Sequence, residues 1–344
     1  MRPDPMTRLA CAALLAATVL GCAAPATRPD GAPDSRQRPV WPPPPAEPRI
    51  AYVRSIAAPA DLGVTPSWLD RAANFLTGGN RGKEPFVKPF GIAFDEAGNL
   101  CVTDTGANVV YFFDLAAKSR QRFEGVGKRR FVAPVAVARK GGVFYVADAG
   151  LRSVLAFDGK GEPLFEIREG VERPAGLAIV GERLYVADAE SHSVAVFDLR
   201  GKFLSRFGRR GLEPGEFNFP THLAGDGDGR LYVTDSMNYR VQVFDAGGGF
   251  LNGIGSLGDG SGHFGRPKGV AVDGFGHVYV TDALYDNLQV FDESGRFLLD
   301  VGSAGSAEGE FWMPAGVAIN RDNEIYVADS YNCRVQVFRY AGGP

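Results

Sequence analysis

Histidine is the side chain best suited both to acid–base catalysis and to zinc binding. This sequence contains four of them: His192, His222, His263 and His277. A catalytic zinc site takes about three protein ligands that converge on one point. The four histidines stand in different kinds of segment, and only His222 belongs to an apolar strand of the kind that could face a shared interior. We therefore expect no catalytic residue, no metal site and no cofactor.

Six aspartates recur at the end of a short strand that reads Tyr-Val-x-Asp or close to it: Asp104, Asp148, Asp188, Asp235, Asp282 and Asp329. Carboxylates in loops can bind cations. Their presence in every copy has a simpler explanation, because an aspartate can accept hydrogen bonds from the amides of a nearby loop. We interpret these six residues as structural.

The aspartates belong to a unit that is repeated six times. Each copy has an opening proline, an apolar strand, a second strand that ends in aspartate, and a third strand that ends in phenylalanine. The opening prolines are spaced 40 to 47 residues apart: Pro89, Pro134, Pro174, Pro220, Pro267 and Pro314. A period in the forties with several short strands per unit is typical of a β-propeller blade. The sequence thus predicts an all-β, six-bladed β-propeller over residues 49–344.

The first strand of each repeat should line the axis of the ring. Two positions after the opening proline, five copies have glycine or alanine and the fourth has His222. Small residues suit this position because the six innermost strands converge and leave little room. We interpret His222 as a polar residue of the axial channel. A contact with a bound ligand and a metal ligand are the alternatives.

A strand from outside the repeats should close the ring. The sixth copy ends its third strand at Phe338 and has no residues for a fourth, whereas residues 49–56 alternate like an outer strand. Pairing this segment into the last blade would cover an exposed sheet edge. Between it and blade one, residues 65–76 predict one short amphipathic helix that ends at Gly78. We expect this helix to pack Trp68 and Phe75 on a face of the propeller.

The motifs of the last three copies resemble the NHL repeat. They read Pro-x-Gly-Val-Ala, Tyr-Val-Thr-Asp and Arg-Val-Gln-Val-Phe-Asp, and the resemblance covers residues 89–344. It implies a six-bladed ring. It also brings in functions of similar propellers: lyases that hold zinc with several histidines, lactonases that hold a divalent cation, and animal domains that bind RNA on a loop face. The alternative to a binding protein is therefore a hydrolase or lyase with an axial site near His222.

The first 22 residues resemble the signal peptide of a bacterial lipoprotein. An apolar run from Leu9 to Leu20 is too short to span a bilayer. The run ends in Val-Leu-Gly-Cys22, which resembles a lipobox and implies lipidation of Cys22. Ala23 after the cysteine favours the outer membrane of the cell envelope. An ordinary secretory signal or a short membrane anchor is the alternative. Residues 23–48 hold nine prolines and predict an extended tether.

Basic residues gather in loops that should share one face of the propeller. The formal net charge of −3 gives the whole chain no attraction to nucleic acid. The basic loop residues are Lys128, Arg129, Arg130, Arg152, Arg209, Arg210, Arg240 and Arg334. We expect them to form an anion-attracting patch; a solvated charged surface is the alternative.

These features together predict a monomeric, lipid-anchored envelope protein. We expect it to bind a protein or an envelope polymer through the loop face, without catalysis and without nucleic acid. Cys101 and Cys333 fall in adjacent blades, so they could pair or remain free.

Overall fold

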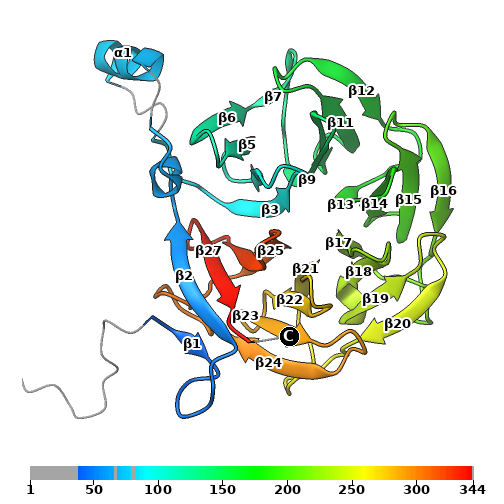
Figure 1. Cartoon of the computed structure of the whole chain (residues 1–344). Coiled ribbons are helices and arrows are strands. Elements are labelled where there is room, and N and C mark those ends of the chain that lie inside the picture. Colours follow the sequence, from blue (N-terminus) through cyan, green and yellow to red (C-terminus); the bar gives the residue numbers. More distant parts are fainter. Residues whose placement is uncertain (1–37, 66–67, 79–82, 343–344) are drawn as a thin grey trace, which may run out of the picture. The chain divides into compact units, whose positions relative to one another are not determined.

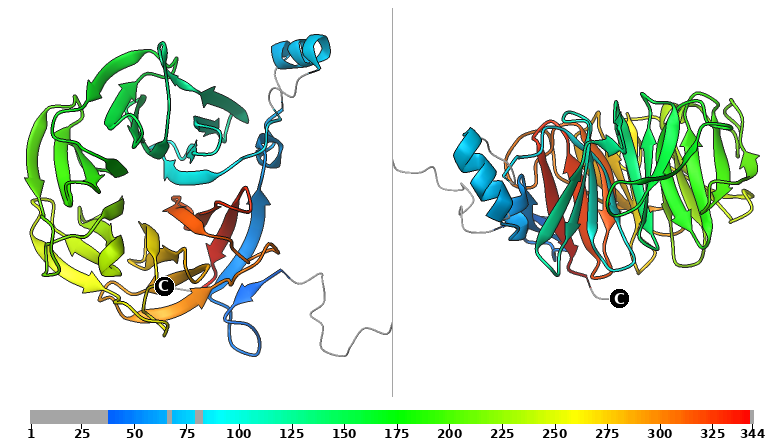
Figure 2. Two further views of the ribbon diagram at one scale, coloured as in Figure 1. Left: turned by 180° about the vertical axis from the view of Figure 1, so that it is seen from behind. Right: turned by 90° about the horizontal axis from the view of Figure 1, so that it is seen from above.

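The computed structural model describes residues 38–65, 68–78 and 83–342. The predicted leader with Cys22, and residues 23–37 of the predicted tether, lie outside these residues. From residue 38 onward the described chain forms six blades, each a β-sheet, around a central axis, and one small separate hairpin (Figure 1). Figure 2 shows the ring from behind and from above. The predicted six-bladed β-propeller is confirmed.

Blades one to five are four-stranded antiparallel sheets whose strands follow one another from the axis to the rim. Blade one contains β3 (Pro89–Phe94), β4 (Leu100–Asp104), β5 (Val109–Asp114) and β6 (Ser119–Phe123). Blade two contains β9 (Pro134–Lys140), β10 (Val143–Asp148), β11 (Ser153–Phe157) and β12 (Pro163–Ile167). Blade three contains β13 (Pro174–Val180), β14 (Arg183–Asp188), β15 (Ser193–Asp198) and β16 (Phe203–Phe207).

Blade four contains β17 (Pro220–Gly225), β18 (Leu231–Asp235), β19 (Arg240–Phe244) and β20 (Phe250–Ile254). Blade five contains β21 (Pro267–Val272), β22 (Val278–Asp282), β23 (Asn287–Phe291) and β24 (Phe297–Val301). A small hairpin of β7 (Gly125–Val126) and β8 (Arg129–Arg130) stands in the connection between blades one and two. The short 3₁₀ helix η2 (Ser236–Asn238) connects β18 to β19.

Blade six joins the two ends of the described chain. Its inner strands are β25 (Pro314–Ile319), β26 (Glu324–Asp329) and β27 (Arg334–Tyr340), and its fourth strand is β2 (Ile50–Ile56). The register places Ile50 opposite Tyr340 and Ile56 opposite Val335. Both isoleucines are fully buried. The predicted closure of the ring by an N-terminal strand is therefore confirmed.

The propeller begins earlier in the chain than residue 49, where the sequence placed its start. Residues 40 and 41 form β1 (Val40–Trp41), which pairs with β2 as a fifth strand of blade six. The reason is apolar burial, because the Trp41 ring packs against Phe338 with 5.7 Å between ring centroids. Residues 40 and 41 therefore belong to blade six, and not to the tether predicted over residues 23–48.

Glycines next to the axis meet the neighbouring blade. A Cβ added to Gly176 would lie 2.3 Å from the carbonyl oxygen of Thr221, and one added to Gly316 would lie 2.4 Å from that of Phe90. Both distances are shorter than van der Waals contact, so these positions require glycine. The expected packing of small residues on the innermost strands is confirmed.

The helix α1 (Trp68–Thr77) forms as predicted, after a short 3₁₀ helix η1 (Pro59–Leu62). Its Phe75 is 90% exposed, so the expected packing of that side chain on the propeller is wrong. Another aromatic residue, Phe86, covers blade one instead. Its ring contacts Tyr111 and Phe113 at centroid distances of 5.4 and 6.2 Å.

Candidate functional site

Two sets of loops share one end of the propeller, which we call the loop face. They are the crossings from one blade to the next and the loops between second and third strands. Antiparallel pairing puts them together: in blade two, Pro134 at the start of β9 pairs with Asp148 at the end of β10. In the same blade, Val154 near the start of β11 pairs with Ile167 at the end of β12.

The six recurrent aspartates hold the loop face together. The backbone amides of Val132 and Ala133, in the crossing, donate to the carboxylate of Asp148 at 2.8 and 2.9 Å. The amides of Gly150 and Leu151, in the next loop, donate to it as well. All six aspartates are fully buried and accept at least one such bond from the crossing. Their structural interpretation is confirmed.

Two of the predicted binding arginines serve the same purpose. Arg240 Nε donates to Asp235 at 2.9 Å, and its Nη2 donates to the carbonyl oxygen of Glu216. Arg334 repeats the arrangement in blade six, at 2.7 Å from Asp329. The two side chains are 18% and 12% exposed. These guanidinium groups are occupied inside the fold, so we leave them out of the binding surface.

The other predicted basic residues are scattered over the loop face. Arg129 pairs with Glu166 at 2.7 Å, Arg130 pairs with Glu124, and Arg209 pairs with Glu216 at 2.8 Å. The remaining three are exposed and form no ion pair within the described residues: Lys128, Arg152 and Arg210. They stand in three separate loops, so no single patch is built from them.

Sequence reasoning missed a more concentrated feature of the loop face, its exposed apolar side chains. The described loops of this face hold nine large ones: Val87, Val132, Leu212, Phe219, Met237, Leu257, Leu284, Trp312 and Tyr331. On the described loops of the opposite face there is one, Phe275. The available signal was position, because three of the nine stand two residues before an opening proline and three others two residues after a recurrent aspartate.

A small aromatic group with a cation lies at the seam of the ring. Trp312 and Tyr331 have ring centroids 5.5 Å apart. Lys88 Nζ lies 4.3 Å above the Tyr331 ring and donates to its hydroxyl at 3.1 Å. The group joins blade six to the segment that enters blade one.

His222 lies in a pocket of about 380 Å³ at the loop-face end of the axial channel. The Phe90 ring packs on the imidazole with 5.6 Å between centroids. Burial, and then the charge of Lys268, lowers the pKa of His222 to about 3. The ring is therefore neutral at physiological pH and a poor general base.

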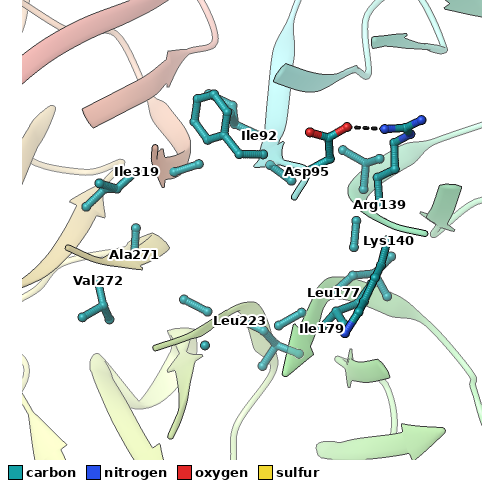
Figure 3. Close-up of a pocket in the computed structure, with 18 of the residues that line it drawn as sticks. Ile92, Asp95, Arg139, Lys140, Leu177, Ile179, Leu223, Ala271, Val272 and Ile319 are labelled. Atoms are coloured by element: carbon teal, nitrogen blue, oxygen red, sulfur yellow. Dashed lines mark hydrogen bonds and ion pairs between the residues drawn. The ribbon is translucent and has the colours of Figure 1, made fainter. Parts of the chain in front are cut away.

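A second cavity, of about 400 Å³, occupies the other end of the channel (Figure 3). Ile92, Leu177, Leu223 and Ile319 surround it. Its charges are compensated, because Arg139 pairs with Asp95, and Lys140 Nζ lies 2.7 Å from the Glu182 carboxylate. The two cavities share no lining residue.

Three further observations concern the described residues as a group. No three His, Cys, Asp or Glu side chains among them gather as a metal site requires. No helix among them has the length and apolar character needed to cross a bilayer. Cys101 and Cys333 are both free thiols, the first buried and the second exposed.

Two of the six repeats match a known family of sequence repeats. The chain matches the NHL repeat over residues 172–197 and 311–338. No curated protein sequence gives a significant match.

Several solved structures share the fold. A streptogramin B lyase is 13% identical with a TM-score of 0.55, over 75% of this chain and 95% of the lyase. A hydrazine synthase of Kuenenia stuttgartiensis is 17% identical with a TM-score of 0.53, over 76% and 98%. A nidogen–laminin complex is 16% identical with a TM-score of 0.53, over 72% and 89%. At such identities the likeness shows the fold alone. The chain is a six-bladed β-propeller in which two segments match the NHL repeat.

Proposed function

We propose that this propeller is a non-catalytic binding protein of the bacterial cell envelope that engages a protein partner through its loop face. The observation that carries the proposal is that the described loops of that face hold nine large exposed apolar side chains, and those of the opposite face one. Large exposed apolar groups that gather on one face are typical of interaction surfaces. Trp, Tyr and Met are among the residues enriched at interface centres.

The face is also suited to binding without rearrangement. Each crossing is tied to its blade by the buried aspartates, and in blade five Gln289 adds a further tie. The Gln289 side chain donates to the carbonyl oxygen of His263 and accepts from the amide of Gly262. A preorganised surface loses little conformational entropy on binding. Lys128, Arg152 and Arg210 are exposed cations of the loop face. Exposed charges around an interface act mainly on the association rate.

The test is replacement of the apolar residues that no blade needs. Leu212→Ser together with Leu284→Ser should weaken retention of the envelope partner without lowering the melting temperature. Leu164→Ser with Leu298→Ser, two exposed residues of outer strands, is the matched control. Equal retention by both pairs would contradict the proposal. An envelope polymer as the partner would appear as retention that survives protease treatment of the extract.

The proposed location depends on the leader. Cys22 follows a lipobox-like run, and acyl chains on this residue would hold the protein at a membrane, in the outer membrane by the rule for Ala23. The prolines between Cys22 and the propeller would set the binding face at a distance from the bilayer.

A hydrolase or lyase with an axial site near His222 is the second candidate. The buried imidazole in a pocket of about 380 Å³ favours it. The lowered pKa of His222 weighs against general-base catalysis, since a base works best with a pKa near the operating pH. We therefore favour binding.

A further inference from the structure

Three basic residues line the loop-face pocket of the axial channel. Arg173 directly precedes the first strand of blade three, Arg266 directly precedes that of blade five, and Lys268 follows its opening proline. Blade four, which supplies His222, lies between them. No acidic side chain lines this pocket. Within the described part of the chain, none of the three cations forms an ion pair or donates a side-chain hydrogen bond.

Three cations without an ion pair meet at this one pocket. Other unpaired cations of the loop face, Lys128, Arg152 and Arg210, stand in three separate loops. Arg129, Arg209, Arg240 and Arg334 each have a carboxylate within 3 Å. Arg173 and Arg266 are exposed and Lys268 is half-buried. Like charges around one cavity repel each other, and burial adds to the cost at Lys268. Accordingly burial, then Arg266 and Arg173, lowers the pKa of Lys268 to about 8. An anion in the pocket would relieve this repulsion.

The pocket also has buried polar atoms without partners. His222 is 8% exposed, and neither of its ring nitrogens has a hydrogen-bond partner. The hydroxyl oxygen of Thr221, beside it on β17, is likewise buried and unpaired. Buried polar groups are almost always hydrogen-bonded in native proteins. A neutral imidazole carries one N–H and the threonine one O–H, so both can donate to an anionic oxygen.

The rest of the lining is apolar. Phe90, Val135, Ala175, Phe219 and Met237 form its walls. The volume of about 380 Å³ is within the range of small-molecule sites and far larger than an inorganic ion. The three cations exclude a metal ion, and the walls favour a ligand with an apolar body.

We infer that this pocket, the axial anion pocket, binds a small organic anion whose carboxylate or phosphate contacts Lys268, Arg173 and Arg266 and whose apolar body rests against Phe90 and Phe219. The pocket shares Phe219 and Met237 with the loop face, but binding of the anion does not depend on the proposed protein partner. Guanidinium groups suit both head groups because their paired N–H donors match two oxygens.

The test uses the full-length chain and three probes that share a phenyl group and differ in the head group: phenylacetate, phenyl phosphate and the neutral phenylacetamide. Calorimetry should show binding of at least one anion, and at least tenfold weaker binding of phenylacetamide. The anion that binds more tightly identifies the head group. Binding of neither anion, or equal binding of phenylacetamide, would overturn the inference.

Variants locate the site. Lys268→Met keeps the length of the side chain and removes its charge, so anion affinity should fall about tenfold or more. Arg266→Gln should act in the same direction. Arg129→Gln, at an arginine that already pairs with Glu166, is the matched control and should leave the affinity unchanged. Unchanged affinity of Lys268→Met, with its fold verified by circular dichroism, would contradict the site. Cross-linking of the partner on the loop face is a separate readout, so the two proposals can fail independently.

Discussion

The Phe90 ring lies 5.6 Å from the imidazole of His222, and the two residues come from opposite blades of the six. Their contact therefore spans the axis. In the other five blades the position of His222 is occupied by glycine or alanine, at Gly91, Ala136, Gly176, Gly269 and Gly316. The fourth blade thus inserts the one large polar side chain at this position, where it packs against the Phe90 ring and shares a pocket with Lys268.

Burial of His222 predicts a pH dependence of stability. The folded protein keeps the ring neutral, with a pKa of about 3, whereas the unfolded chain binds a proton below the ordinary value of 6.5. The contribution of His222 is therefore fully present above pH 6.5 and decreases as the pH falls toward 3. Its slope should be about 1.4 kcal/mol per pH unit. Denaturant unfolding at a series of pH values gives the free energy of unfolding of wild type and of His222→Gln. The difference between the two should change with pH by this slope, and a difference that is the same at every pH would contradict the prediction.

Because β2 closes the ring, a substitution that removes a buried apolar side chain from this strand should destabilise the protein. Ile56 is fully buried opposite Val335, so Ile56→Ala should lower the free energy of unfolding by about 2–5 kcal/mol. Arg49→Ala, beside the same strand, should cost less than about 1 kcal/mol because its ion pair with Glu47 is exposed and 3.9 Å long. Urea titration measures both. Equal losses of unfolding free energy in the two variants would mean that β2 does not stabilise the ring.

A substitution of Arg334 tests whether this residue stabilises the fold or belongs to the binding surface. Removing it leaves the fully buried carboxylate of Asp329 without its cation, so Arg334→Ala should lower stability by about 3 kcal/mol or more. Arg210→Ala removes an exposed, unpaired cation and should change stability by less than about 0.5 kcal/mol. If Arg334→Ala left the free energy of unfolding unchanged, Arg334 would again be a candidate for the binding surface.

The anchor is tested at Cys22. If this cysteine carries the acyl chains, Cys22→Ser should move the protein from the membrane fraction to the soluble fraction of detergent-free lysates. The Cys333→Ser variant, which removes the exposed thiol of the propeller, should remain with the membranes. Membrane association that survives Cys22→Ser would contradict lipidation at this residue.

The repeat pattern determined most of the fold in advance. The opening prolines, the recurrent aspartates and the alternation of residues 49–56 are local features that each blade needs for its own hydrogen bonds, so they can be read from one sequence. The position of Phe75 could not be read in this way. An amphipathic pattern shows that a helix has an apolar side but not what covers it, and Phe86 takes the place on blade one.

The candidate site was harder to predict for a physical reason. Charge is visible in a sequence, but its compensation depends on neighbours distant along the chain. Arg129 and Glu166 are 37 residues apart and lie 2.7 Å from each other. Arg173 and Lys268 look no different in the sequence, yet they meet at one pocket without a carboxylate. Only the arrangement of blades three to five around the axis separates the two cases.

The central claim is that the loop face meets a protein partner, and cross-linking in living cells tests it most directly. A photo-reactive residue at Leu284 or Trp312, 60% and 54% exposed on the loop face, is compared with one at Leu251, 51% exposed on an outer strand. A protein partner on the loop face should give a discrete, protease-sensitive cross-linked product from both loop-face positions and none from Leu251. Products of equal yield from Leu251, or none from either loop-face position, would contradict it.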